Sequence, residues 1–138
     1  MSSAKQAFQD ASALSLEQKK TILQEIIDGM DERREEFAQV ISEEMGAPIK
    51  VARGAQFSSG KVHFKNTLKV IDIFSFSEVH DNITLNKLPI GPVGMITPWN
   101  WPLNQMCTKI ASAIAAGTSF VLKPVSYTHL RAHETQDD

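Results

Sequence analysis

The stretch 88–123 constrains the fold of this chain most strongly. It contains a short apolar run, a turn bracketed by prolines, a helical segment that Pro102 opens, a stop at Gly117 and a second apolar run. The missing N–H of proline costs nothing in the first turn of a helix, and glycine commonly ends one. Two strands joined by such a helix form a βαβ unit, the smallest piece of a parallel sheet. We therefore expect an α/β fold.

Two polar side chains, Asn100 and Lys123, stand where the expected strands 93–96 and 119–122 end. Open α/β sheets bind ligands beyond the carboxyl ends of their strands, so both residues are candidates for a site. Asn100 could donate an amide N–H to a developing oxyanion, or it could form a turn or cap the helix. Lys123 could hold ribose hydroxyls or a phosphate, or it could be a solvated lysine at a strand end. The residues alone leave both alternatives open.

Five further residues could take part in catalysis or ligand binding: four lie in the stretch 88–123, and one is a histidine before it. Lys109 is either a solvated helix lysine or, if turned inward, a proton carrier. Cys107, the single cysteine, lies within the apolar helix without a neighbouring histidine, so we interpret it as a small buried hydrophobe and not as a nucleophile. His63 has no partner at metal-ligand spacing. Gly91 and Gly94 do not form a GxGxxG fingerprint, so an ordinary dinucleotide loop is not predicted.

The N-terminal half has the apolar spacing of helices. A short helix is expected over 2–12, and Ser15 followed by Gln18 is the capping-box pattern that opens a second one. Gly29 predicts a bend or break near the charged run 31–36. A second apolar series follows, and it should end at Gly46 because glycine favours the position after a helix.

A third helix is expected over 49–73, and its candidate buried side chains are Val51, Ala55, Val62, Leu68 and Ile71. The pattern then changes to alternation with a period of two over 83–88, which is typical of a strand, and the turn chemistry at 80–82 predicts a hairpin. An alternating segment of this kind is either an edge strand that pairs with another subunit or an ordinary surface hairpin.

Composition argues against several classes of function. The net charge is −2 and the pI is about 6.1, which does not favour a nucleic acid or an anionic membrane surface as a partner. A single cysteine permits no intrachain disulfide and indicates a reducing, cytoplasmic setting. The N-terminus lacks the layout of a signal peptide, and no run approaches the ~20 apolar residues of a membrane span. We expect a soluble protein that is not exported.

Two ordered blocks of the sequence resemble the aldehyde dehydrogenase family. The first is ITPWNWPL at 96–103, followed by Lys109, and the second is GTSFVLKP at 117–124. Family members typically read PxGxxGxIxPWNxPL, then a lysine, then ALAAGNxVVLKPSE. The SLEQK start and the EMGAP end of the upstream helices agree as well, so the resemblance covers about residues 2–124.

This resemblance implies an α/β fold made of N-terminal helices and the first βαβ unit of a Rossmann-like cofactor domain, which is incomplete in this chain. Residues 1–73 would be the helical part of that domain, 74–90 the strands of an oligomerisation arm, and 91–124 the start of the sheet. The resemblance also implies NAD or NADP as the cofactor, an aldehyde as the substrate, and a homo-oligomer for the full-length protein.

The family's functional residues carry over to matching positions only. Asn100 would be the oxyanion-stabilising asparagine, and Lys109 would match a lysine often assigned a proton-relay role. The residues that would line the cofactor cleft or bond the adenosine ribose are Ile96, Thr97, Pro98, Trp99 and Lys123. The family's glycine-rich loop, general-base glutamate and nucleophilic cysteine have no match here, and Cys107 is not at the nucleophile's position. A thiolate must attack the aldehyde before hydride leaves, so we expect the chain itself to be inactive.

After Pro124 the sequence leaves the family pattern. Residues 125–135 read VSYTHLRAHET and resemble the translation of a transposase adapter used to prepare DNA sequencing libraries. We therefore expect 125–138 to be a non-native tail. His129 and His133 are four residues apart, but two ligands alone make a weak metal site, so we interpret them as part of that tail.

Two interpretations follow. In the first, the chain is a fragment of an NAD(P)-dependent aldehyde dehydrogenase whose chemistry resides in the full-length protein. In the second, it is a small non-catalytic helical protein that pairs with other subunits through the strand 82–88. Under the first, Ile96, Val121 and Leu122 would lack neighbouring strands, which predicts marginal stability for the chain on its own.

Overall fold

The structure is a computed structural model that describes residues 2–124, and it has an α/β fold. The tail expected to be non-native, 125–138, lies outside the described residues. In chain order the elements are α1 (Ser2–Ala13), α2 (Leu16–Glu32), α3 (Arg34–Met45), α4 (Ile49–Val51), the π-helical turn η1 (Ala52–Gln56), α5 (Phe57–Ile71), β1 (Ser77–His80), β2 (Ile83–Asn86), β3 (Val93–Thr97), α6 (Pro102–Ala116) and β4 (Phe120–Pro124).

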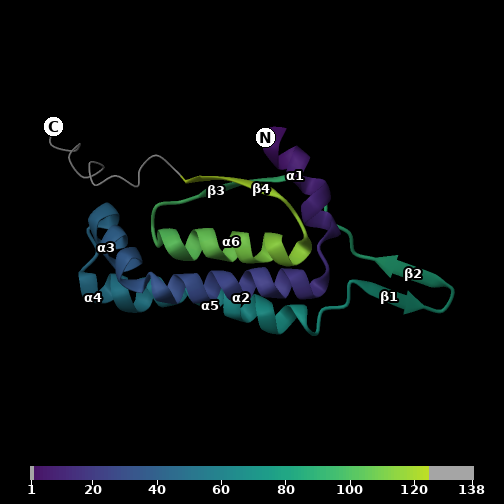
Figure 1. Ribbon diagram of the computed structural model, residues 1–138, viewed down its shortest axis with the longest axis horizontal. Helices are drawn as coiled ribbons and strands as arrows, with labels where there is room; N and C mark the ends of the chain where they lie inside the picture. Colours follow the sequence, from purple (N-terminus) through teal and green to yellow (C-terminus); the bar gives the residue numbers. More distant parts are fainter. Residues whose placement is uncertain (1, 125–138) are drawn as a thin grey trace.

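Helix α6 is the middle layer of the fold (Figure 1). The parallel pair β3 and β4 covers one side of it, and α2 and α5 pack side by side on the other. Because it is enclosed on both sides, α6 is apolar over most of its length, and Leu103, Cys107 and Ala111 are buried in the main core. This arrangement fixes the position of the loop that enters α6.

Local sequence signals explain most of the helix ends. Ser15 and Gln18 form the predicted capping box, in which the Gln18 N–H donates to Ser15 Oγ at 3.2 Å and the Ser15 N–H donates to Gln18 Oε1 at 2.8 Å. Gly46 ends α3 in the left-handed conformation with φ 67°. The break predicted near the charged run 31–36 is present at Arg33, which separates α2 from α3, although α2 continues through Gly29 itself. Glycine interrupts a helix only weakly, at a cost of about 1 kcal/mol.

The helix predicted over 49–73 is present but contains the π-helical turn η1. A π-turn adds one residue to the helix and so rotates the faces on either side of it relative to each other. Of the side chains predicted to be buried, Ile71 is buried and Leu68 is partly buried. The prediction is wrong for Ala55, Val51 and Val62, which are exposed, the last two by 41% and 42%. The buried residues of this segment are Ala52, Gln56, Phe57, Gly60, Phe64 and Ile71.

The hairpin of β1 and β2 extends away from the helices (Figure 1). Its strands pair antiparallel, and the turn places Asp81 at φ 50°, which short polar side chains tolerate. Val79 and Ile83 are largely exposed, and the outer edges of the hairpin are unpaired within residues 2–124. The strand expected over 83–88 ends at Asn86.

The parallel pair β3–β4 alternates between a buried and an open face. Met95 and Thr97 are buried on the side of α6, whereas Ile96 between them is 68% exposed. The start of β4 is tied to α1, because the buried Ser119 Oγ donates to the Ala4 carbonyl at 2.7 Å. No helix within the described part of the chain is long and apolar enough to cross a membrane.

Candidate functional site

The loop 98–101 leads from β3 into α6 and is held in an unusual conformation. Trp101 has φ 62° and ψ 58°, in the left-handed region, where a bulky residue is an outlier. Such strain costs of the order of 1–3 kcal/mol and persists where the surrounding structure enforces it, often at functional sites. Here Pro102 fixes the next φ, and the Trp101 carbonyl accepts the first helical hydrogen bond from the Gln105 N–H at 3.0 Å. The loop is therefore rigid.

Asn100 is exposed within this loop. Trp101, not Asn100, occupies the N-cap position of α6. The Asn100 side chain forms no hydrogen bond with any residue in the range 2–124, so the structure does not use it as a helix cap. Among the described residues its amide N–H groups have no acceptor, so they could donate to a ligand.

Ile96 and Lys123 lie next to each other at the carboxyl edge of the two strands. They are register partners in the parallel ladder, and both side chains are exposed on the face that points away from α6. Lys123 forms no ion pair within the described chain. Within residues 2–124, this edge therefore presents an apolar surface beside a cation that has no ion-pair partner.

The other cofactor-site candidates differ in how they face this edge. Pro98 and Trp99 are exposed in the loop that follows β3. Thr97 is 1% exposed and points to the opposite side of the sheet from Ile96, so its side chain does not share that open face.

Lys109 is not placed with Asn100. It lies two turns into α6 from Pro102 and is half-buried. It lines a separate hollow of about 400 Å³ that is shared with the segment before β3, including Leu88, Pro89 and Ile90.

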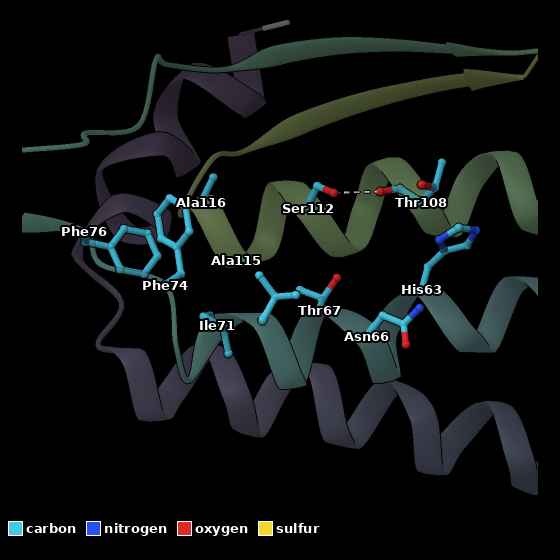
Figure 2. A pocket seen from close by; sticks show the side chains of 11 residues that line it. His63, Asn66, Thr67, Ile71, Phe74, Phe76, Thr108, Ser112, Ala115 and Ala116 are labelled. Carbon is cyan, nitrogen blue, oxygen red and sulfur yellow. Dashed lines mark hydrogen bonds between the residues drawn. The ribbon is translucent and has the colours of Figure 1, made fainter.

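A groove of about 380 Å³ runs between α5 and α6 (Figure 2). His63 stands at one end, where its Nε2 donates to Asn104 Oδ1 at 2.7 Å and so links the two helices. Phe74 and Phe76 stand at the other end, with ring centroids 4.8 Å apart in an edge-to-face arrangement. The sequence reasoning missed this groove. One signal was present: the polar residues of α6 recur every four positions, at Asn104, Thr108 and Ser112.

Cys107 behaves as the sequence predicted. It is buried in the core, and burial raises the pKa of its thiol to about 12, so it stays protonated at neutral pH. A protonated thiol is a poor nucleophile. Among the described residues, no three histidine, cysteine, aspartate or glutamate side chains gather in a group that could hold a metal ion.

A parallel βαβ unit with a rigid polar loop at its carboxyl edge is typical of Rossmann-like enzymes. Comparison with known proteins makes the family explicit. The model of the aldehyde dehydrogenase family matches residues 1–136, and the chain therefore belongs to that family.

Individual relatives agree with this assignment. The chain is 38% identical over 122 residues to 3-succinoylsemialdehyde-pyridine dehydrogenase from Pseudomonas sp., a match that covers 88% of this chain and 26% of that protein. An aldehyde dehydrogenase C variant from Pseudomonas syringae, solved with NAD⁺ and octanal, superposes with a TM-score of 0.88 at 39% identity, over 92% of this chain and 26% of that one.

A more distant structure has the same fold. Glyceraldehyde-3-phosphate dehydrogenase from Methanocaldococcus jannaschii, solved with NADP, superposes with a TM-score of 0.80 at 30% identity, over 88% of this chain and 27% of that one. The chain thus spans about a quarter of the length of the relatives that it matches.

Proposed function

We propose that this chain is a fragment that forms the first part of the cofactor domain of an NAD(P)-dependent aldehyde dehydrogenase, which oxidises an aldehyde to a carboxylic acid. The observation that carries the proposal is the junction of the rigid Asn100 loop with the Ile96–Lys123 edge at the carboxyl ends of two parallel strands. NAD or NADP, when bound, accepts the hydride that leaves the substrate carbon.

The residues of this edge fit a dinucleotide. The exposed Ile96 side chain offers apolar surface to a flat ring, and the Lys123 ammonium can donate to ribose hydroxyls or to a phosphate. Pro98 and Trp99 would complete the wall of the cleft, and Thr97 would support it from the α6 side. The solved relatives hold NAD⁺ in one case and NADP in another, so either nucleotide suits the proposal.

In this proposal Asn100 is a catalytic residue. Its free amide N–H would donate to the oxygen of the tetrahedral intermediate as negative charge develops there. Such a donor is effective only if it needs no reorganisation, and the strained Trp101 and Pro102 hold the loop in place. Lys109 faces a different hollow, so a proton that it carries would be exchanged there and not at the Asn100 loop.

The nucleophile and the general base would come from outside residues 2–124. Cys107 is protonated and enclosed, so it cannot supply the thiolate that attacks the aldehyde. We therefore propose that the chain by itself has no dehydrogenase activity. The same buried thiol fits a reducing, cytoplasmic setting.

The hairpin of β1 and β2 is proposed as an arm that pairs subunits into a homo-oligomer. Its exposed Val79 and Ile83 and its unpaired edges also suit the alternative function, a non-catalytic protein that acts by strand pairing alone. The two functions differ in whether the Asn100 loop matters for a reaction.

A graft tests the proposal. Residues 2–124 would replace the matching segment of the Pseudomonas syringae enzyme, with the catalytic cysteine restored, and NAD(P)H formation from octanal would be followed at 340 nm. We expect the graft to be active and the 138-residue chain alone to be inactive. A soluble, folded graft that neither binds NAD(P) nor oxidises aldehyde would contradict the proposal, as would activity of the chain alone.

A further inference from the structure

We propose that His63 of α5 is a positioning residue: through its hydrogen bond to Asn104 it holds the first turn of α6, and with that turn the loop that carries Asn100. This inference rests on the proposed function, in which Asn100 donates to the reacting oxygen. His63 lies on a different helix from that loop and does not itself touch the substrate in this proposal. Its effect on the reaction comes from where it places Asn100.

Helix α6 begins without the usual local support. Its N-cap is Trp101, whose side chain has no hydrogen-bond acceptor, so no side-chain cap satisfies the N–H groups of the first turn. Pro102 removes one of these groups, but the backbone N–H groups of Leu103 and Asn104 have no partner inside the helix. Helix ends fray, so a first turn of this kind depends on tertiary contacts.

Contacts with α5 supply that support. Gly60 lies directly against Leu103, because it has no Cβ to prevent the approach. One turn further along α5, His63 points toward α6 (Figure 2), and its Nε2 donates to Asn104 Oδ1 at 2.7 Å. The apolar contact fixes how closely the two helices approach. The hydrogen bond is directional, so it also fixes how α6 is rotated about its own axis.

The first turn of α6 is joined directly to the Asn100 loop. Asn104 is three residues from Trp101, whose carbonyl accepts the first helical hydrogen bond from the Gln105 N–H at 3.0 Å. Asn100 precedes Trp101 by one peptide bond, and Pro102 fixes the backbone angle at the junction. The loop and the turn therefore move together, and fraying or rotation of the turn displaces the Asn100 amide.

The His63–Asn104 hydrogen bond is costly to break on one side only. Both residues are half-buried, and within residues 2–124 neither side chain forms another hydrogen bond. Removing one partner leaves the other unsatisfied, which costs more than the net gain from the bond. A displacement of about 1 Å at a reacting group can lower a rate about a hundredfold, so a small movement of Asn100 is enough to be measured.

The test compares substitutions of His63 that keep or remove the donor at the place of Nε2. The amide nitrogen of glutamine lies about as far from the backbone as histidine Nε2, whereas that of asparagine lies nearer and corresponds to Nδ1. His63→Gln should therefore keep the bond, and His63→Asn should remove it. Asn66→Ala is the control on α5, because Asn66 is exposed and forms no hydrogen bond with the other described residues.

The first measurement is backbone hydrogen exchange in the 138-residue chain, followed by NMR. The Gln105 amide reports opening of the first turn of α6, and the Thr118 amide, which donates to the Ala113 carbonyl at 2.9 Å, reports the other end. We expect His63→Asn to speed exchange about three- to tenfold at Gln105 and no more than about twofold at Thr118, the size expected for one lost hydrogen bond. His63→Gln and Asn66→Ala should leave both rates unchanged. Unchanged exchange at Gln105 in His63→Asn, or equal acceleration at both amides, would overturn the inference.

The second measurement is the steady-state kinetics of the active graft. His63→Asn should lower kcat about tenfold or more with little change in the cofactor KM, because a misplaced Asn100 acts in the transition state. His63→Gln should keep the kcat of the unmodified graft. A normal kcat in His63→Asn, or an equal loss in both variants, would remove the role of His63. A graft that is inactive with the unmodified segment would instead remove the proposed function and the catalytic part of this inference with it, while the exchange rates still decide whether His63 holds the turn.

Discussion

Gly60 of α5 and Leu103 of α6 pack so closely that a Cβ atom on Gly60 would lie 2.5 Å from Leu103 Cγ. The same atom would lie 3.2 Å from Cys107 Sγ. Real Cβ contacts are never as short as the first of these distances, so only glycine allows α5 to approach the first turn of α6 this closely. The contact sets the position of the helix that follows the Asn100 loop.

Gly60→Ala should therefore destabilise the chain by about 1–3 kcal/mol, the usual cost of overpacking a core. Gly29→Ala is the matched control, because Gly29 is also in a helix and a Cβ there meets nothing within 4 Å. That change should stabilise the chain by up to about 1 kcal/mol. Urea unfolding of both variants measures the difference, and equal midpoints would show that the close approach has no energetic weight.

Ser15→Ala should lower the free energy of unfolding by about 1 kcal/mol, because it removes the side-chain acceptor of the capping box at the start of α2. Ser58→Ala changes an exposed serine inside α5 and should leave stability unchanged or slightly higher. Thermal unfolding followed by circular dichroism compares the two. A loss of the same size in both variants would argue against the cap.

Cys107 should react very slowly with thiol reagents at pH 8 in the folded chain and rapidly once the chain unfolds in guanidinium. Burial raises its pKa from 9.0 to about 12, so the folded state favours the protonated thiol. Its contribution to stability is complete below pH 9 and falls as the pH rises from 9 toward 12. Cys107→Val should remove this part of the pH dependence, and fast modification of the folded chain would contradict the assignment.

Lys19→Met should stabilise the chain at pH 7. The side chain is only 8% exposed, has no carboxylate partner among the described residues, and burial lowers its pKa from the ordinary value. A depressed lysine pKa means that the folded state disfavours the ammonium, so the gain should shrink as the pH rises toward 10.5. Lys20→Met is the control, since it breaks an ion pair with Asp72 at 2.7 Å and should not stabilise. Destabilisation by Lys19→Met would show that the ammonium holds the end of α6.

Strong local signals made much of the fold predictable from the sequence. The Ser15–Gln18 capping box, the stop at Gly117 and the βαβ order of 88–123 each depend on a few adjacent residues, and each is present in the structure. The π-helical turn was not predictable in the same way. It packs against α3, a contact between separate segments that local propensity does not reveal.

In the candidate site too, features set by local sequence were predictable and features set by tertiary packing were not. Asn100 and Lys123 were identified because strand ends and proline-bracketed turns are visible in the sequence. The left-handed Trp101 and the His63–Asn104 hydrogen bond were not, because a strained backbone angle and a contact between residues 41 positions apart arise only from tertiary packing. The spacing of polar residues in α6 indicated the helix face that carries Asn104, but it could not predict that His63 of α5 contacts this face.

The central claim is that Asn100 acts in catalysis and Lys123 in cofactor binding. The most direct test measures kcat and the cofactor KM separately for a variant of each residue in the active graft. Asn100→Ala should lower kcat by about 10²–10³ with little change in the KM for the cofactor, because its amide would act in the transition state. Lys123→Met should raise the cofactor KM about tenfold with little change in kcat, because it would remove one charge-assisted hydrogen bond to the bound nucleotide. Unchanged kinetics in both variants would contradict these roles. So would a raised cofactor KM with normal kcat in Asn100→Ala together with a lowered kcat with normal KM in Lys123→Met.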